Sequence, residues 1–429
     1  MRSSTKVAAS IHFIGLCVFA PAILAEEPTN PTGSQPALVL EQHQQVGVQP
    51  DAMTAEEALL QPARDPRPMS SADQGRAIEP QAMADSSTGQ GIVQPSSDPM
   101  ATADSDMAKV LQKHQQLGAK PIAGLTAEEA RLQPSPADAV AAVLKAEGKA
   151  MPTLGVAKRD LTYPTAGTSQ PIRIYTPGSA RDDSALPVIV YYHGGGWVIA
   201  DIDTYESSAM ALAQKANAIV ASVDYRKAPE HKFPASHEDA FAAYQWVLAN
   251  ASSFGGDPKQ VAVAGESAGG NLAANVAIMA RDQGAQAPTH MLLIYPVADS
   301  SMATESYLEF ANAKPLGKPA MQWFVEKALN PEDSKNPMID LVNANLKGLP
   351  PATVITAQID PLRSEGKALA DRLQAAGSEV TYRNFEGVTH EFFGMGAVVA
   401  DAAAAQDLAA RGLNASFQSG VVATTDADE

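Results

Sequence analysis

The chain has 429 residues, which is enough for one large α/β domain with additional segments. Its formal net charge of −17 at pH 7 disfavours binding to nucleic acid and to anionic membrane surfaces. The single cysteine, Cys17, excludes an internal disulfide framework. Beyond the N-terminus no run is long and apolar enough to cross a bilayer, so no membrane span is expected in the mature chain.

The first 25 residues have the pattern of an export signal. Arg2 and Lys6 provide a basic start, residues 7–20 are mostly apolar, and Ala25 is a small residue at a suitable cleavage position. A membrane anchor is the alternative interpretation, but the apolar stretch is short for one. We therefore expect a signal peptide at residues 1–25 and a periplasmic or secreted protein.

Residues 26–108 are rich in Pro, Ser, Gln, Asp and Ala and contain no aromatic residue. Such a stretch cannot bury enough apolar surface to offset its loss of conformational entropy, so we expect a disordered linker. The linker contains a degenerate repeat copy, because residues 39–47 resemble residues 110–118. We expect the second copy to pack, as part of N-terminal lid helices at residues 109–155.

From residue 156 onward, strand and helix patterns alternate, which predicts a catalytic α/β domain at residues 156–429. The domain is expected to have a mostly parallel eight-stranded sheet with helices on both faces. A segment at about 298–347 contains four prolines around one helical stretch and predicts a lid insertion. The expected strands are residues 159–163, 172–176, 188–192, 219–224, 261–264, 291–296, 353–359 and 380–385. The expected helices of the domain are residues 207–216, 237–249, 268–281, 365–375 and 400–413.

The pentapeptide Gly265-Glu266-Ser267-Ala268-Gly269 lies between a strand pattern and a helix pattern. This strand–turn–helix context is typical of a nucleophile elbow. In such a turn the serine hydroxyl is held clear of the sheet, and glycines are needed where strand and helix pass closest. A bare G-x-S-x-G also arises by chance, so the context carries the assignment. We expect Ser267 to be a nucleophile.

The sequence HGGGW at residues 193–197 follows an apolar strand pattern. Loops of the HGGG type supply backbone N–H donors to an oxyanion. We therefore expect an oxyanion hole formed by Gly194, Gly195, Gly196 and Ala268. The histidine of the motif is expected to hold the loop by hydrogen bonds.

A serine nucleophile needs a base, and the base needs a carboxylate that orients it. With an elbow of this kind the acid and then the histidine follow the serine along the chain. Only His290 and His390 lie beyond Ser267; His290 opens a strand and is expected to be structural. His390 follows the last strand and is the expected base. Asp360 ends the preceding strand and is the expected acid, with an N-cap of the next helix as its alternative role.

Together with these motifs, DYRKAPEHKFPA at residues 224–235 and DPLR at residues 360–363 resemble the bacterial hormone-sensitive-lipase family (family IV) of carboxylesterases. The resemblance runs from about residue 109 to the C-terminus. It implies an α/β-hydrolase fold, no cofactor or metal, a helical lid and a structural loop at residues 224–235. The chain departs from the family at Glu266 and at Ser364, where the family often has Asp.

The expected function is a serine carboxylesterase that hydrolyses short- to medium-chain acyl esters of small molecules through an acyl-enzyme. A non-catalytic ligand-binding protein is an alternative, although the gibberellin receptors of this kind lack the catalytic histidine. A hydrolase of amides or lactones is another. We expect Trp197 and Glu266 to contribute to the substrate pocket, with a hydrophobic loop anchor as an equal alternative for Trp197. The oligomeric state stays open, a homodimer being one option.

Overall fold

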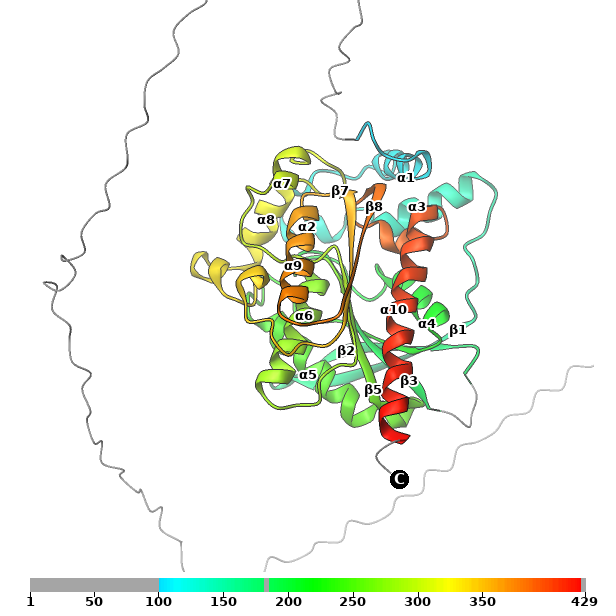
Figure 1. Ribbon diagram of the computed structural model, residues 1–429. Coiled ribbons are helices and arrows are strands. Elements are labelled where there is room, and N and C mark those ends of the chain that lie inside the picture. The colour runs from blue at the N-terminus through cyan, green and yellow to red at the C-terminus, as the bar shows by residue number, and fades with distance from the viewer. Residues whose placement is uncertain (1–99, 181–184, 426–429) are drawn as a thin grey trace, which may run out of the picture. The chain divides into compact units, whose positions relative to one another are not determined.

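The computed structural model describes residues 100–180 and 185–425, with side chains up to residue 419. The expected signal peptide and nearly all of the expected linker lie outside the described residues. The described residues belong to one unit, which is built around an eight-stranded sheet (Figure 1).

The sheet has the strand order β1-β2-β4-β3-β5-β6-β7-β8. The pairs β1–β2 and β2–β4 are antiparallel, and every other neighbouring pair is parallel. The mostly parallel sheet and all eight strands expected from the sequence are therefore confirmed. The strands are β1 (Val156–Thr165), β2 (Thr168–Pro177), β3 (Leu186–Tyr192), β4 (Ile219–Val223), β5 (Gly256–Glu266), β6 (Met291–Ile294), β7 (Ala352–Ile359) and β8 (Val380–Thr389).

Helices cover both faces of the sheet (Figure 1). The helices α4 (Glu206–Ala216) and α10 (Ala400–Thr425) pack on one face, and α5 (Ala235–Asn250), α6 (Ala268–Asp282) and α9 (Arg363–Ala375) pack on the other. Successive side chains of a strand point to opposite faces, so each central strand contributes to both cores. This is why β3 and residues 261–264 of β5 are continuous apolar runs.

The segment before β1 forms four short helical elements. They are α1 (Ser105–Gln116), a 3₁₀ turn η1 (Ile122–Gly124), α2 (Ala127–Arg131) and α3 (Pro136–Ala146). The helix α2 begins with a capping box in which the Thr126 and Glu129 side chains bond each other's backbone N–H groups.

The expected linker boundary at residue 108 is wrong, because α1 already begins at Ser105. Met107 is fully buried in the core between the sheet and α10, and the backbone N–H of Asp104 donates to the carbonyl of Gly387 in β8 at 2.8 Å. The buried side chains of Met107 and Val110, together with this backbone bond, pack α1 against the domain although its sequence is mostly polar.

The insertion between β6 and β7 contains α7 (Glu305–Glu309), α8 (Lys318–Ala328) and the turns η3 (Pro331–Lys335) and η4 (Leu341–Asn343). Of these elements the sequence predicted only α8.

The lid has two parts that meet. The indole N–H of Trp323 in α8 donates to the carbonyl of Leu125 after η1 at 2.9 Å. The helices α1 and α3 do not share this role, because they pack against each other and against the region of β8 and the turn that follows it. The main contacts of the expected N-terminal lid with α8 are thus made by η1 and Leu125.

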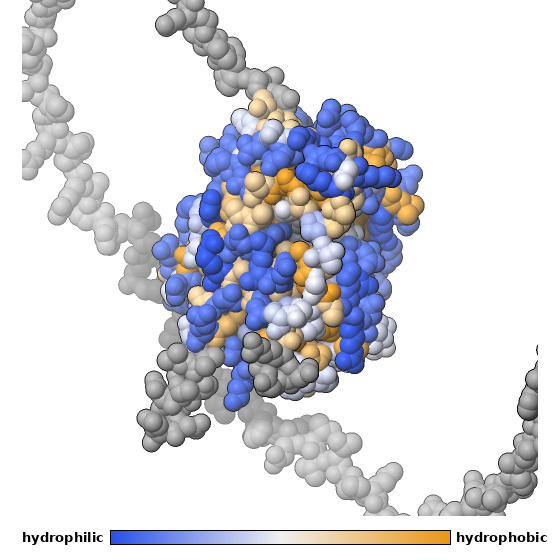
Figure 2. Space-filling view, turned by 90° about the vertical axis from the view of Figure 1, so that its right-hand side faces the viewer, coloured by the Kyte–Doolittle hydropathy of each residue, from blue (hydrophilic) through white to orange (hydrophobic). Residues whose placement is uncertain are grey.

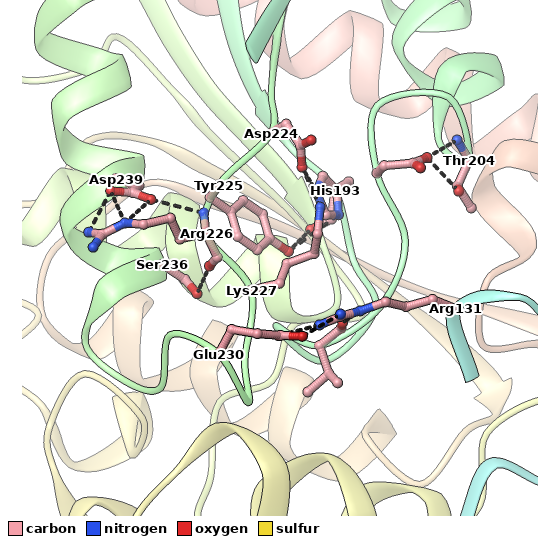
Figure 3. A network of polar contacts seen from close by, with 12 residues as sticks. Arg131, His193, Thr204, Asp224, Tyr225, Arg226, Lys227, Glu230, Ser236 and Asp239 are labelled. Carbon is pink, nitrogen blue, oxygen red and sulfur yellow. Dashed lines mark hydrogen bonds and ion pairs between the residues drawn. The ribbon is translucent and has the colours of Figure 1, made fainter. Parts of the chain in front are cut away.

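Arg131, at the end of α2, fastens the N-terminal lid segment to the domain. Its guanidinium donates to both carboxylate oxygens of Glu230 at 2.7 Å and to the carbonyls of Val198 and Ala228 at 2.9 and 2.8 Å (Figure 3). The planar donor fork of arginine suits such a set of acceptors. The contact ties α2 to the loops that follow β3 and β4.

The molecular face that carries α3, α4 and α10 is a mosaic of hydrophilic side chains and small apolar areas (Figure 2). Among the described residues, no helix combines the length and the apolar character needed to cross a bilayer.

Candidate active site

The turn between β5 and α6 holds Ser267 in a strained conformation, with φ +57° and ψ −119°. Such an angle is rare for a residue with a side chain. A Cβ atom at Gly265 would collide with the carbonyl of Gly269, and one at Gly269 would collide with the carbonyl of Tyr192. The two glycines therefore permit the sharp turn, as the elbow interpretation required.

The structure brings Ser267, His390 and Asp360 together at the carboxyl ends of β5, β8 and β7. His390 Nε2 lies 3.0 Å from Ser267 Oγ, and His390 Nδ1 lies 2.7 Å from Asp360 Oδ2. The other oxygen of Asp360 accepts the backbone N–H of Leu362 at 2.8 Å. Asp360 thus orients the imidazole while also bonding the start of the following helix.

Nearby negative charges raise the pKa of His390 more than burial lowers it. Burial acts to lower the pKa of this imidazole, but the charge and hydrogen bond of Asp360, with smaller contributions from Glu391 and Glu266, hold its pKa above the ordinary value. The imidazolium form is therefore stabilised at this position. That form is the one a general base adopts after it has taken up a proton.

The glycine loop lies beside Ser267 and has the backbone freedom its sequence implies. Gly195 and Gly196 have φ angles of +92° and +58°. A Cβ on Gly194 would collide with the hydroxyl of Tyr205, and one on Gly196 would collide with the ring of Phe324 in α8. The lid thus packs directly on this loop.

Backbone donors are free at the glycine loop and the elbow. Within the part of the chain that the structure describes, the N–H groups of Gly195, Gly196 and Ala268 donate to no other protein group. Ala268 is the first residue of α6, where N–H groups carry the positive end of the helix dipole. The arrangement offers an anion binding position next to Ser267.

His193 holds the loop through contacts within the loop and with the segment that follows β4. Its Nδ1 lies 2.8 Å from the carbonyl oxygen of Gly194, and its ring stacks on Tyr225 at 4.3 Å (Figure 3). The Tyr225 hydroxyl donates to the carbonyl of His193 at 2.9 Å. Burial alone would raise the pKa of Asp224 nearby, but its contacts with His193 and Lys227 lower that pKa to about 2. These contacts agree with a structural role for His193.

The chain matches an α/β-hydrolase-fold family model over residues 189–394. It is 42% identical to carboxylesterase NlhH of Mycobacterium tuberculosis over 267 residues, which are 61% of this chain and 83% of the relative. It is 34% identical to an ethyl acetate hydrolase of Pseudomonas putida over 290 residues, covering 66% of this chain and 88% of the relative. An esterase structure from the archaeon Pyrobaculum calidifontis superposes with a TM-score of 0.66 at 35% identity, covering 73% of this chain and 98% of the other.

The chain belongs to the hormone-sensitive-lipase family of α/β-hydrolase carboxylesterases. The predictions of family and fold class are confirmed. His290, the second histidine beyond Ser267, is buried away from the triad and contacts Ser416 and Thr353 at 2.9 and 3.0 Å. Burial lowers its pKa to about 4, which keeps it neutral.

Glu266 is buried and bonded to two tyrosines, and its expected contribution to the substrate pocket stays a prediction. One carboxylate oxygen accepts the Tyr191 hydroxyl at 2.5 Å and the other accepts the Tyr295 hydroxyl. All three side chains are buried. A side chain at the end of β5 must point to one face of the sheet, and Glu266 points to the α4–α10 side, into the core.

Trp197 is a buried residue beside the lid. Its indole lies 6.0 Å from the ring of His237. Both side chains line a small cavity together with Ala328 and Leu329 of the lid insertion. The anchor role of Trp197 fits this burial. Its expected contribution to the acyl pocket stays a prediction.

Two polar residues near the triad were missed by the sequence analysis. Glu391 follows His390 directly, and its Oε1 lies 3.8 Å from His390 Nε2. Tyr205, the residue before α4, donates to the carboxylate of Glu391 at 2.7 Å. The sequence shows only that an acidic residue follows the expected base. It does not show where the side chain of Glu391 points.

In the described part of the chain, no group of three or more His, Cys, Asp or Glu side chains is arranged to hold a metal ion.

Proposed function

We propose that this protein is a serine carboxylesterase that hydrolyses short- to medium-chain acyl esters of small molecules. The observation that carries the proposal is the hydrogen-bonded series Ser267–His390–Asp360 at a strained elbow next to free backbone donors. Membership of a carboxylesterase family supports the choice of an ester as substrate.

In the first half of the reaction the Ser267 oxygen attacks the ester carbonyl while His390 Nε2 takes the hydroxyl proton. Asp360 keeps Nδ1 protonated and stabilises the imidazolium. His390 then gives the proton to the leaving alcohol as the carbon–oxygen bond breaks. The product of this half is an acyl group on Ser267.

In the second half, water attacks the acyl-enzyme and His390 takes the proton of that water. The proton returns to the Ser267 oxygen as the acid leaves. Both halves pass through an oxyanion. It would accept hydrogen bonds from the N–H groups of Gly195, of Ala268 and of either Gly194 or Gly196.

We expect kcat/KM to rise from acetyl to butyryl or hexanoyl esters and then to fall for longer chains. Each buried methylene contributes about 0.8 kcal/mol until the pocket is full. The lid is closed on the glycine loop, with the Phe324 ring against Gly196 and Trp323 joined to the N-terminal segment. Such a lid favours an enclosed pocket of limited length.

The measurement is a series of p-nitrophenyl esters from acetate to palmitate at a pH near 8. Highest activity on emulsified long-chain substrate would instead indicate a lipase. Hydrolysis of anilides or lactones with a higher kcat/KM than any ester would favour the other hydrolase class. Tight ligand binding without turnover would favour a binding protein.

We also propose export to the periplasm or the medium, because residues 1–25 have the composition of a signal peptide. Expression of the full chain in a bacterial host should yield a mature protein outside the cytoplasm that begins at Glu26. N-terminal sequencing of the fractionated protein tests this. An uncleaved chain in the cytoplasmic fraction would contradict it.

A further inference from the structure

Glu391 has an unusual backbone for its residue type. Its φ angle is +73°, in the left-handed region that favours glycine. Holding a glutamate there costs conformational free energy that a glycine would avoid. The surrounding contacts therefore have to stabilise this side chain in its position.

The position of the Glu391 carboxylate is set by Tyr205. The phenol of Tyr205 lies 2.7 Å from both carboxylate oxygens of Glu391, and Tyr205 itself is buried. In this position Oε1 is 3.8 Å from His390 Nε2, the nitrogen that also contacts Ser267 Oγ at 3.0 Å. Asp360 contacts the other nitrogen of the ring. The imidazole thus has a carboxylate near each of its nitrogens.

A third acidic group lies close by. Burial, and then the charge of Glu391, raise the pKa of Glu266 to about 7, even though the hydroxyls of Tyr191 and Tyr295 bond its carboxylate. Among the described residues, no lysine or arginine forms an ion pair with Glu266 or Glu391, so their charge is not neutralised by a fixed cation.

Other groups near the cluster stay neutral during turnover. Burial raises the pKa values of the surrounding tyrosines far above neutrality, so none of them carries charge at working pH. The titratable groups that interact with His390 or Glu391 from all packed elements are Asp360, Glu266, Tyr191, Tyr205, Tyr225 and Tyr295.

We infer that Glu391 is a positioning residue for the reaction, whose carboxylate, fixed by Tyr205, stabilises the imidazolium of His390 on the Nε2 side. This inference rests on the proposed role of His390 as general base. When Nε2 takes the proton of Ser267, the new positive charge forms next to Oε1 of Glu391. The transition state therefore gains more from this carboxylate than the neutral resting imidazole does.

The pH dependence of kcat/KM can test this role of Glu391, because the role predicts the direction in which the acid limb moves. Because a nearby anion favours the protonated imidazole, removing the Glu391 charge lowers the pKa of His390. The neutral base then persists to lower pH, so the acid limb of the kcat/KM profile moves to lower pH while the plateau rate falls. A residue with only a structural role would lower the rate without moving the limb.

The experiment compares Glu391→Gln with wild type from pH 4.5 to 9 on p-nitrophenyl butyrate. We expect the acid limb to move down by about 0.5–1 pH unit and the plateau to fall about 3- to 10-fold. The shift stays modest because Glu266, once its charged neighbour is gone, ionises more readily and offsets part of the lost charge.

Two further variants make the result decisive. Glu391→Gly also removes the carboxylate, and glycine adopts a positive φ angle without strain. This variant therefore tests the inference even if the glutamine variant does not fold. Glu386→Gln removes one exposed charge from β8, away from His390, and should leave the profile unchanged. An unmoved acid limb in both Glu391 variants would overturn the inference. If wild type lacked esterase activity, the proposed function itself would fail, which is a separate outcome.

Discussion

Replacing Ser267 by alanine is expected to lower kcat for ester hydrolysis by on the order of 10⁴-fold or more. The side chain supplies the oxygen that bonds to the acyl carbon, and no other hydroxyl shares its position at the elbow. The fold should persist, because Ser267 owes its conformation to the glycines around it and buries no large apolar group. The measurement is kcat on p-nitrophenyl butyrate, with circular dichroism to verify the fold.

A matched control is Ser301→Ala, which removes a hydroxyl from the lid loop after β6 and should keep near wild-type kcat. If the folded Ser267 variant kept more than a few per cent of wild-type activity, Ser267 would not be the nucleophile. A loss of folding would show instead that the elbow depends on the serine hydroxyl.

The second large effect is expected for Asp360→Asn, with a loss of about 10³- to 10⁴-fold in kcat near pH 7. Asp360 Oδ2 accepts the Nδ1 proton of His390 at 2.7 Å, which leaves the Nε2 lone pair facing Ser267. An asparagine can turn its amide N–H₂ toward Nδ1 and thereby favour the tautomer with hydrogen on Nε2. That tautomer cannot take the proton of Ser267.

Asp371→Asn is a suitable control, because it removes one charge from an exposed position on α9, where Asp371 pairs only with Lys367. It should leave kcat within about two-fold of wild type. Equal activity of the Asp360 and Asp371 variants would remove Asp360 from the mechanism. The alternative role of Asp360, a bond to the start of α9, would then be its main contribution.

Local patterns were sufficient to predict the sheet and the triad. Buried parallel strands read as apolar runs, and the elbow needs glycines on both sides of Ser267, so these features are visible without tertiary information. His390 could be chosen over His290 because the former follows the last strand on a loop. The loop motif at residues 193–197 predicted backbone donors for an oxyanion, and the N–H groups of Gly195 and Gly196 form no bond with other described residues.

Features that depend on packing between distant segments were not predictable. The start of α1 depends on Met107 reaching a core formed largely by later elements, and short helices such as α7 have too few residues for a periodic pattern. The burial of Glu266 depends on tyrosines from β3 and the end of β6. A single sequence shows that Glu391 is acidic, but not that Tyr205 turns it toward His390.

Ser267 is expected to carry the acyl group during turnover. The most direct test is to label the protein with one equivalent of a p-nitrophenyl phosphonate and to map the adduct by peptide mass spectrometry while residual activity is followed. We expect one adduct per chain, on the peptide that contains Ser267, with activity falling in proportion to labelling. An adduct on another residue, or full activity after complete labelling of Ser267, would contradict it.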